Sequence, residues 1–360
     1  MTGSVPFEST TACTADGFEL PIRIFRPSAR GRATVLLLHG ASASSETFEW
    51  PRRAGFLDHL LARGASVVVP EWRGGHVVAG RETTRIREFT LDAIAEHDVP
   101  TLLRVTQEVA GPDQEIAMLA HCVGGGVASM TIGGRLLPEG VRLRRVAITA
   151  LGLFYQVPWH GWVKALDQML ERLSLETPTL PFLHPGADAD PSLAWPEAVE
   201  RVYQGVGRGL VPAGESDFYR RLSFMFGEPY RRELVPDAIH RDALPTLFGA
   251  LPLALFIHGT QNIRRGFAAP FDDVGQTSRT RRYLDASAFA AHEVLLVTGA
   301  RNSLWHRDSI DRMATFLRDR GDATRVRSRV LPRFAHQDLF WSEPARDEVY
   351  PLLADHLLGA

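Results

Sequence analysis

Short runs of consecutive apolar residues recur along the chain and predict buried β-strands. In each run the apolar residues are adjacent rather than alternating with polar ones. That pattern is typical of parallel strands covered on both faces. Amphipathic stretches lie between the runs, and two of them, FLDHLLARG (56–64) and IDRMATFLRDRG (310–321), end at a glycine as helices do. The alternation predicts an α/β fold with a mostly parallel central sheet and helices on both faces. The runs are ATVLLLHG (33–40), ASVVVPEWR (65–73), EIAMLAH (115–121), RRVAITAL (144–151) and HEVLLVTG (292–299).

Residues 152–285 break this alternation. They hold many proline, glycine and aromatic residues, and the strand–helix pattern resumes only at His292. We interpret them as a mostly helical cap inserted into a core formed by residues 1–151 and 286–360. Such a cap is expected to lie over the carboxyl ends of the core strands and to enclose an apolar pocket there.

Composition narrows the class of protein. The 360 residues are 45% apolar and 23% charged, with a formal net charge of −2, which indicates a soluble globular protein without a nucleic-acid partner. The apolar runs are too short to span a membrane, and the first residues do not resemble a signal peptide, so a cytoplasmic enzyme is expected. Two cysteines do not make a disulfide framework. No cofactor or metal is expected, and the sequence favours no particular oligomeric state.

The segment EIAMLAHCVGGGVASM (115–130) carries the first candidate for chemistry. A strand, a nucleophile and a helix rich in small residues follow one another, as in the G-x-S-x-G nucleophile elbow. Here the nucleophile position is Cys122, with Ala120 and Gly124 as the small residues on either side. A helix N-terminus favours a thiolate. We therefore predict that Cys122 is a nucleophile and interpret Cys13 as structural.

A histidine near the end of the chain is the predicted base. Triad partners on such folds follow in the order nucleophile, acid, histidine. His336 stands in the loop after the strand-like RVRSRVL (325–331) and fits that order. His39 and His121 are interpreted as residues that shape their turns.

The acid position holds an amide. Asn302 ends the G-x-x-D-like segment GARN (299–302) after a predicted strand. A serine enzyme needs a carboxylate to stabilise the imidazolium, whereas a cysteine can pair with the histidine as thiolate and imidazolium at rest. An amide oxygen would then only orient the ring by accepting its Nδ1–H. Asn302 is the predicted third member, with Asp308 and Asp338 as alternatives.

Backbone groups are the predicted oxyanion donors. One is the N–H of Val123, directly after the nucleophile, and the other is that of Ala41, with Ser42 as the next choice. Trp72 and Arg73 in PEWRGG (70–75) are interpreted as structural support beside the site.

These motifs resemble the α/β-hydrolase superfamily over nearly the whole chain. More narrowly, the chain resembles the Cys-elbow hydrolase domain found fused to cholesterol-oxidase-like (GMC-type) flavin oxidoreductases. The resemblance implies the α/β-hydrolase fold, the roles of Cys122 and His336, and acyl hydrolysis. It supplies no flavin, because the chain has no flavin-binding half. The matching segments are LLLHGASASSETF, PEWRGG, FTLDAIAEHDVP, LAHCVGG, VTGARNSLW and PRFAHQDLFW with EVYPLLADHL.

The expected activity is that of an esterase or thioesterase. Cys122 would form a thioester with an apolar acyl group, taken from a small-molecule or carrier-bound substrate, and water would release it. Two alternatives stay open. An acyltransferase or cyclase would use the same residues with an acceptor other than water. A non-catalytic binding protein would retain the fold alone, and Asn302 favours this reading.

Overall fold

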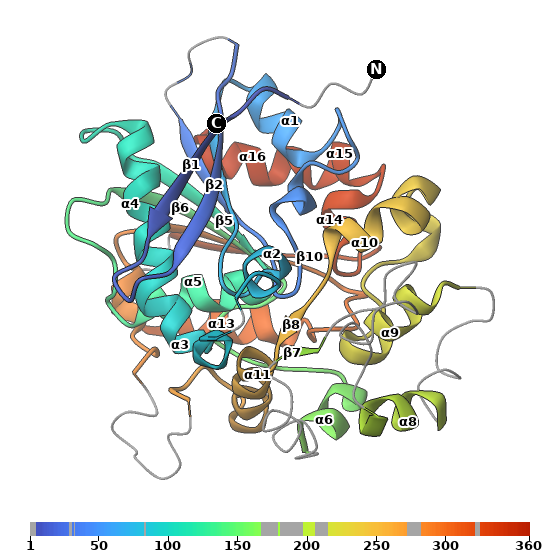
Figure 1. Cartoon of the computed structure of the whole chain (residues 1–360). Helices are drawn as coiled ribbons and strands as arrows, with labels where there is room; N and C mark the ends of the chain where they lie inside the picture. The colour runs from blue at the N-terminus through green and yellow to red at the C-terminus, as the bar shows by residue number, and fades with distance from the viewer. Residues whose placement is uncertain are drawn as a thin grey trace.

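A single eight-stranded sheet forms the centre of the molecule. The computed structural model describes residues 5–28, 31, 33–82, 84–166, 179–180, 197–205, 215–271, 282–320 and 325–360. The strand order is β1-β2-β4-β3-β5-β6-β9-β10 (Figure 1). The pairings from β4 to β10 are parallel, whereas β1–β2 and β2–β4 are antiparallel. The strands are β1 (Glu8–Cys13), β2 (Glu19–Phe25), β3 (Thr34–Leu38), β4 (Ser66–Pro70), β5 (Ile116–His121), β6 (Leu143–Thr149), β9 (Glu293–Gly299) and β10 (Val326–Leu331).

Helices cover both faces of this sheet. Alternate side chains of a strand point to opposite faces, so Val35 and Leu37 of β3 pack with one layer and Leu36 and Leu38 with the other. The first layer holds α1 (Phe56–Ala62) and α16 (Tyr350–Leu358). The second layer holds α4 (Val99–Ala110), α5 (Val123–Gly133) and α13 (Asp308–Arg320). The predicted α/β architecture is therefore confirmed.

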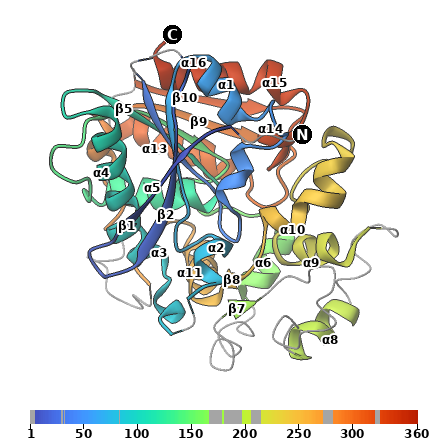
Figure 2. The same cartoon turned by 45° about the horizontal axis from the view of Figure 1, so that its top comes forward.

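Most of the described residues between β6 and β9 are helical. In both views α6, α8, α9 and α11 gather at the end of the molecule away from α1 and α16 (Figures 1 and 2). The described part of this segment also contains a two-residue antiparallel pair, β7 with β8, and an isolated antiparallel bridge from Phe248 to Ala43. Its elements are α6 (Trp159–Leu166), β7 (Thr179–Leu180), α8 (Glu197–Gly205), α9 (Asp217–Phe226), α10 (Leu244–Leu247), β8 (Leu251–Pro252) and α11 (Leu253–Arg265).

Shorter helices complete the core. One π-helical turn (Ile94–Asp98) joins α3 to α4. Among the described residues no helix has the length and apolar character needed to cross a membrane. The remaining core helices are α2 (His76–Ala79), α3 (Leu91–Ala93), α14 (Asp338–Trp341) and α15 (Ala345–Glu348).

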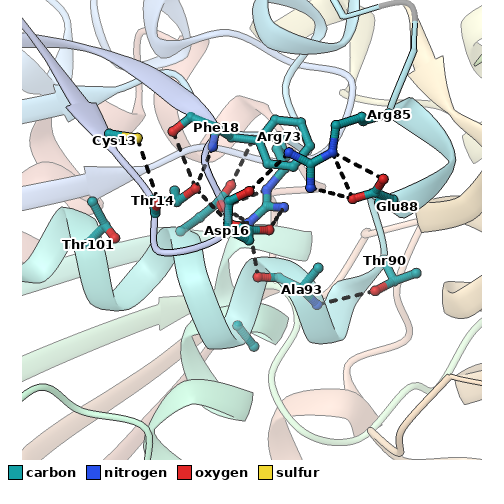
Figure 3. A network of polar contacts seen from close by, with 12 residues as sticks. Cys13, Thr14, Asp16, Phe18, Arg73, Arg85, Glu88, Thr90, Ala93 and Thr101 are labelled. Atoms are coloured by element: carbon teal, nitrogen blue, oxygen red, sulfur yellow. Dashed lines mark hydrogen bonds and ion pairs between the residues drawn. The ribbon is translucent and has the colours of Figure 1, made fainter.

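A buried arginine ties the antiparallel edge to the rest of the sheet. Arg73 follows β4, and its Nε donates to Asp98 Oδ1 at 2.7 Å. Its Nη1 donates to Asp16 Oδ2 at 2.5 Å, in the turn between β1 and β2, and its guanidinium lies 4.4 Å from the centre of the Phe18 ring (Figure 3). The planar fork suits two carboxylates at once. Arg73 thus holds the β1–β2 hairpin in place, in agreement with its interpretation as structural support.

Candidate active site

The turn at Cys122 has the strained backbone of a nucleophile elbow. Cys122 connects β5 to α5 with φ 57° and ψ −131°. Non-glycine residues rarely adopt a positive φ. The turn projects the cysteine side chain away from the strand and places its sulfur at the start of the helix.

Small residues allow this turn to form. A Cβ added at Gly124 would lie 2.3 Å from the carbonyl oxygen of His39, and one added at Gly40 would lie 3.0 Å from the Cβ of Cys122. Backbone atoms therefore leave no room for a side chain at position 124. Ala120 is fully buried in β5 opposite Leu38, where its methyl group is tolerated.

Two backbone donors and one side chain face the sulfur. The N–H groups of Val123 and Ala41 and the indole of Trp305 each stabilise the thiolate form of Cys122. Burial acts against them and is stronger, so the pKa of the thiol is raised to about 11. This differs from the thiolate expected from the helix N-terminus. The physical reason is that the sulfur is removed from water.

His336 lies in the same pocket as Cys122. It precedes α14, is almost fully buried, and lines the pocket together with Cys122, Val123 and Ala41. Among the described residues neither ring nitrogen of His336 has a hydrogen-bond partner. Burial lowers its pKa to about 3. The raised pKa of the thiol and the lowered pKa of the imidazole both favour the neutral pair over the ion pair expected at rest.

Neither alternative acid contacts His336. Asp308 is half-buried at the start of α13, and its carboxylate lies 3.2 Å from the Nδ1 of His306. Asp338 is fully buried, but both its oxygens accept the backbone N–H of Ala335, at 2.9 and 3.0 Å. Burial raises the pKa of the Asp338 carboxyl to about 6. Their assignment as the third member stays a prediction.

Asn302 uses its amide oxygen within its own loop. Its Oδ1 accepts the backbone N–H groups of Leu304 at 3.0 Å and Trp305 at 3.1 Å. Because both partners are N–H donors, the amide atom that faces them is the oxygen. Nδ2 therefore points elsewhere, and it is buried without a partner among the described residues. The amide oxygen does not accept the ring N–H of His336 here, which differs from the geometry expected from the sequence.

The two other histidines near the elbow hold the scaffold. His39 Nδ1 lies 2.8 Å from the carbonyl oxygen of Gly40, and its Nε2 lies 3.3 Å from the Glu71 carboxylate. His121 Nδ1 lies 2.8 Å from Thr149 Oγ1, and its ring packs against that of His336 with centroids 4.6 Å apart. Both are fully buried, as residues that shape turns would be.

The pocket above Cys122 is lined almost entirely by apolar groups. None of its lining side chains is a carboxylate, lysine or arginine. Sequence reasoning identified the core residues but not Tyr155 and Trp305, which bring the main polar hydrogens into the pocket. Their sequence neighbourhoods carry no motif that would have shown this. From the segment between β6 and β9 come Tyr155, Val157, Gly161, Leu222, Met225, Phe226, Pro229, Phe248, Leu251, Leu255, Phe256, Gly259, Thr260 and Ile263.

The described residues offer no site for a metal. No group of three histidine, cysteine, aspartate or glutamate side chains among them could hold an ion.

The neutral resting pair predicts how Cys122 reacts with an alkylating agent. In a Cys13→Ala variant, we expect the rate at which iodoacetamide modifies Cys122 to be low at pH 7 and to rise with pH up to about 11, because only the thiolate reacts. Intact-mass measurement at a series of pH values would follow the reaction. A rate that is already constant between pH 6 and 9 would contradict the neutral pair and indicate a thiolate at rest.

Solved structures share the fold. No family model matches the chain, and no curated protein matches it either. A thermostable carboxyl esterase from Bacillus coagulans is 15% identical, with 99% of each chain covered and a TM-score of 0.61. A lipase in an open form is 17% identical, with 98% of each chain covered and a TM-score of 0.60. A soluble variant of monoglyceride lipase from Saccharomyces cerevisiae is 11% identical, covering 99% of this chain and 95% of that one, with a TM-score of 0.56.

These likenesses show that the chain has the α/β-hydrolase fold. The strand order, with the elbow after β5, matches it as well. At such identities the likeness shows the fold alone, because one fold hosts many activities. The narrower resemblance to a domain fused to flavin oxidoreductases stays a prediction.

Proposed function

We propose that the protein is an acyl hydrolase, an esterase or thioesterase, that acts through a cysteine thioester. The observation that carries the proposal is the position of Cys122. It stands on a strained strand-to-helix turn, opens into an apolar pocket, and is faced by the N–H groups of Val123 and Ala41. The shared fold of esterases and lipases supports it.

The reaction would proceed in two halves. His336 accepts the thiol proton while the sulfur attacks the acyl carbonyl, and the N–H groups of Val123 and Ala41 stabilise the oxyanion. Collapse of this intermediate breaks the bond to the leaving group, which takes the proton from His336. Water then attacks the thioester with His336 again as base, and the thiol and the free acid are restored.

The apolar lining determines the class of acyl group. No charged side chain lines the pocket, and an unpaired charge is costly to bury. The pocket therefore suits a neutral, apolar acyl chain rather than a dicarboxylic one.

The activity is tested with p-nitrophenyl esters of two to twelve carbons, with and without an added alcohol or thiol. A hydrolase releases the free acid in both cases. Transfer of the acyl group to the added acceptor would identify an acyltransferase, and the absence of both turnover and adduct would favour a binding protein. Product analysis by mass spectrometry separates these outcomes.

A glycine in α11 allows the pocket to be filled without a clash. Gly259 lines the pocket, and a Cβ added there meets no atom within 4 Å. We expect Gly259→Phe to lower the ratio of kcat/KM for a decanoyl ester to that for an acetyl ester at least about tenfold, since the ring occupies the space of the longer chain.

The matched control is Gly259→Ala. A methyl group removes little space, so its ratio should stay much closer to that of the wild type. A chain-length profile that is the same in the phenylalanine variant and the wild type would show that the acyl chain does not pass under α11.

A further inference from the structure

Tyr155 and Trp305 each bring a polar hydrogen into a mostly apolar pocket, which Thr260, His336 and Gln337 also line. Tyr155 and Trp305 both line it, and their rings meet edge to face with centroids 5.5 Å apart. Tyr155 is fully buried and Trp305 is 9% exposed. Among the described residues the Tyr155 hydroxyl has no acceptor for its proton, and the Trp305 indole N–H faces only the Cys122 sulfur.

Both groups lie close to Cys122. A Cβ added at Gly126 would come within 2.8 Å of the Tyr155 hydroxyl oxygen. Gly126 stands about one turn of α5 beyond Cys122. Trp305 is held by its backbone N–H, which donates to Asn302. The Trp305 indole and the Tyr155 hydroxyl therefore both lie near the Cys122 sulfur.

Asn262 leaves the hydroxyl proton of Tyr155 free. This residue of α11 accepts the backbone N–H of Ala269 on its Oδ1 at 3.0 Å, so its Nδ2 points the other way. Nδ2 is near enough to Tyr155 to stabilise negative charge on the hydroxyl oxygen. Because an NH₂ group only donates, it can approach the oxygen but cannot take the proton. The Tyr155 O–H remains available to an acceptor in the pocket.

Buried donors without acceptors are unusual in folded proteins. A ligand that places an acceptor opposite such a donor gains a hydrogen bond inside the pocket. We propose that the natural substrate is an apolar acyl compound with an additional oxygen acceptor a few bonds from the reacting carbonyl, which the Tyr155 hydroxyl binds with the Trp305 N–H beside it. This inference rests on the proposed acyl-hydrolase function and adds the substrate class.

The proposal is tested with acyl esters that carry one ether oxygen at different positions along the chain. The probes are p-nitrophenyl octanoate and its analogues with one chain CH₂ replaced by an ether oxygen at position 3, 4, 5, 6 or 7. An ether oxygen is only an acceptor and is similar in size to CH₂. For one position we expect the ratio of kcat/KM, ether over octanoate, to fall about tenfold in Tyr155→Phe relative to the wild type, the usual effect of one buried hydrogen bond. Comparing the two enzymes cancels differences in the intrinsic reactivity of the esters.

Tyr350→Phe is the matched control. Tyr350 is a buried tyrosine whose hydroxyl donates to the Phe340 carbonyl, and it does not line the pocket. Its variant should keep the wild-type ratios at every position. If the ratios of Tyr155→Phe equal those of the wild type at all five positions, the proposal is overturned even though the esters are hydrolysed. Loss of the proposed function itself would be recognised separately, by turnover that persists in Cys122→Ala.

Discussion

Replacing Cys122 with alanine is expected to lower kcat/KM for an activated ester by on the order of 10⁴-fold or more. The sulfur is the only nucleophile that the elbow presents to the pocket. Without it, the donors at Val123 and Ala41 and the imidazole of His336 can assist only the direct attack of water. Steady-state kinetics with p-nitrophenyl butyrate measure the loss.

Detection of the acyl-enzyme is a second test of the role of Cys122. Rapid acid quenching during turnover, followed by intact-mass analysis, should show the wild-type protein with the mass of one acyl group and Cys122→Ala without it. Cys13→Ala is the matched control, because Cys13 is exposed at the end of β1, where its thiol donates to the Thr14 carbonyl at 3.6 Å. An acyl adduct that persists in Cys122→Ala, or turnover that survives it, would remove Cys122 from the mechanism.

The central sheet was predictable because its strands are buried on both faces. A run of consecutive apolar residues, such as VLLL in β3, is typical of a parallel strand that helices cover on both faces. The elbow was predictable for a steric reason, since the contact of Gly124 with His39 demands a small residue at a fixed distance from the nucleophile.

The edge of the sheet was not predictable in the same way. β1 is exposed along most of its length and β2 alternates buried and half-buried positions, so neither has the apolar run of a central strand. What holds them is the Arg73–Asp16–Asp98 network, whose members are far apart in the sequence. The polar hydrogens of Tyr155 and Trp305 were missed for the same reason, because only the folded chain brings them beside Cys122.

Asn302 makes a contact that the sequence did not predict. The residue follows β9, as predicted for the third triad member, but its oxygen accepts the backbone N–H groups of Leu304 and Trp305. The atom left over is Nδ2, a donor. An aspartate at this position could keep both backbone contacts with one oxygen and place a negatively charged acceptor where Nδ2 now lies.

The double change Cys122→Ser with Asn302→Asp is therefore expected to be about 100-fold more active than Cys122→Ser alone. A hydroxyl is far less acidic than a thiol, so the serine reaction depends on an imidazolium that a carboxylate stabilises. In a serine protease the corresponding loss of the carboxylate costs about 10⁴-fold in kcat. Burial alone already lowers the pKa of His336 to about 3, so an unsupported imidazolium is especially unfavourable here.

The matched comparison is Asn302→Asp in the cysteine enzyme, which completes a double-mutant cycle on one p-nitrophenyl ester. Because the thiol gives up its proton more readily, the aspartate should help the cysteine enzyme much less than the serine enzyme, and the difference between the two gains is the coupling between positions 122 and 302. Asp308→Asn and Asp338→Asn in the Cys122→Ser background measure the two alternatives. If aspartate at 302 gives the serine enzyme no advantage, while one of these changes lowers its remaining activity, then residue 302 only supports its loop and that aspartate is the third member.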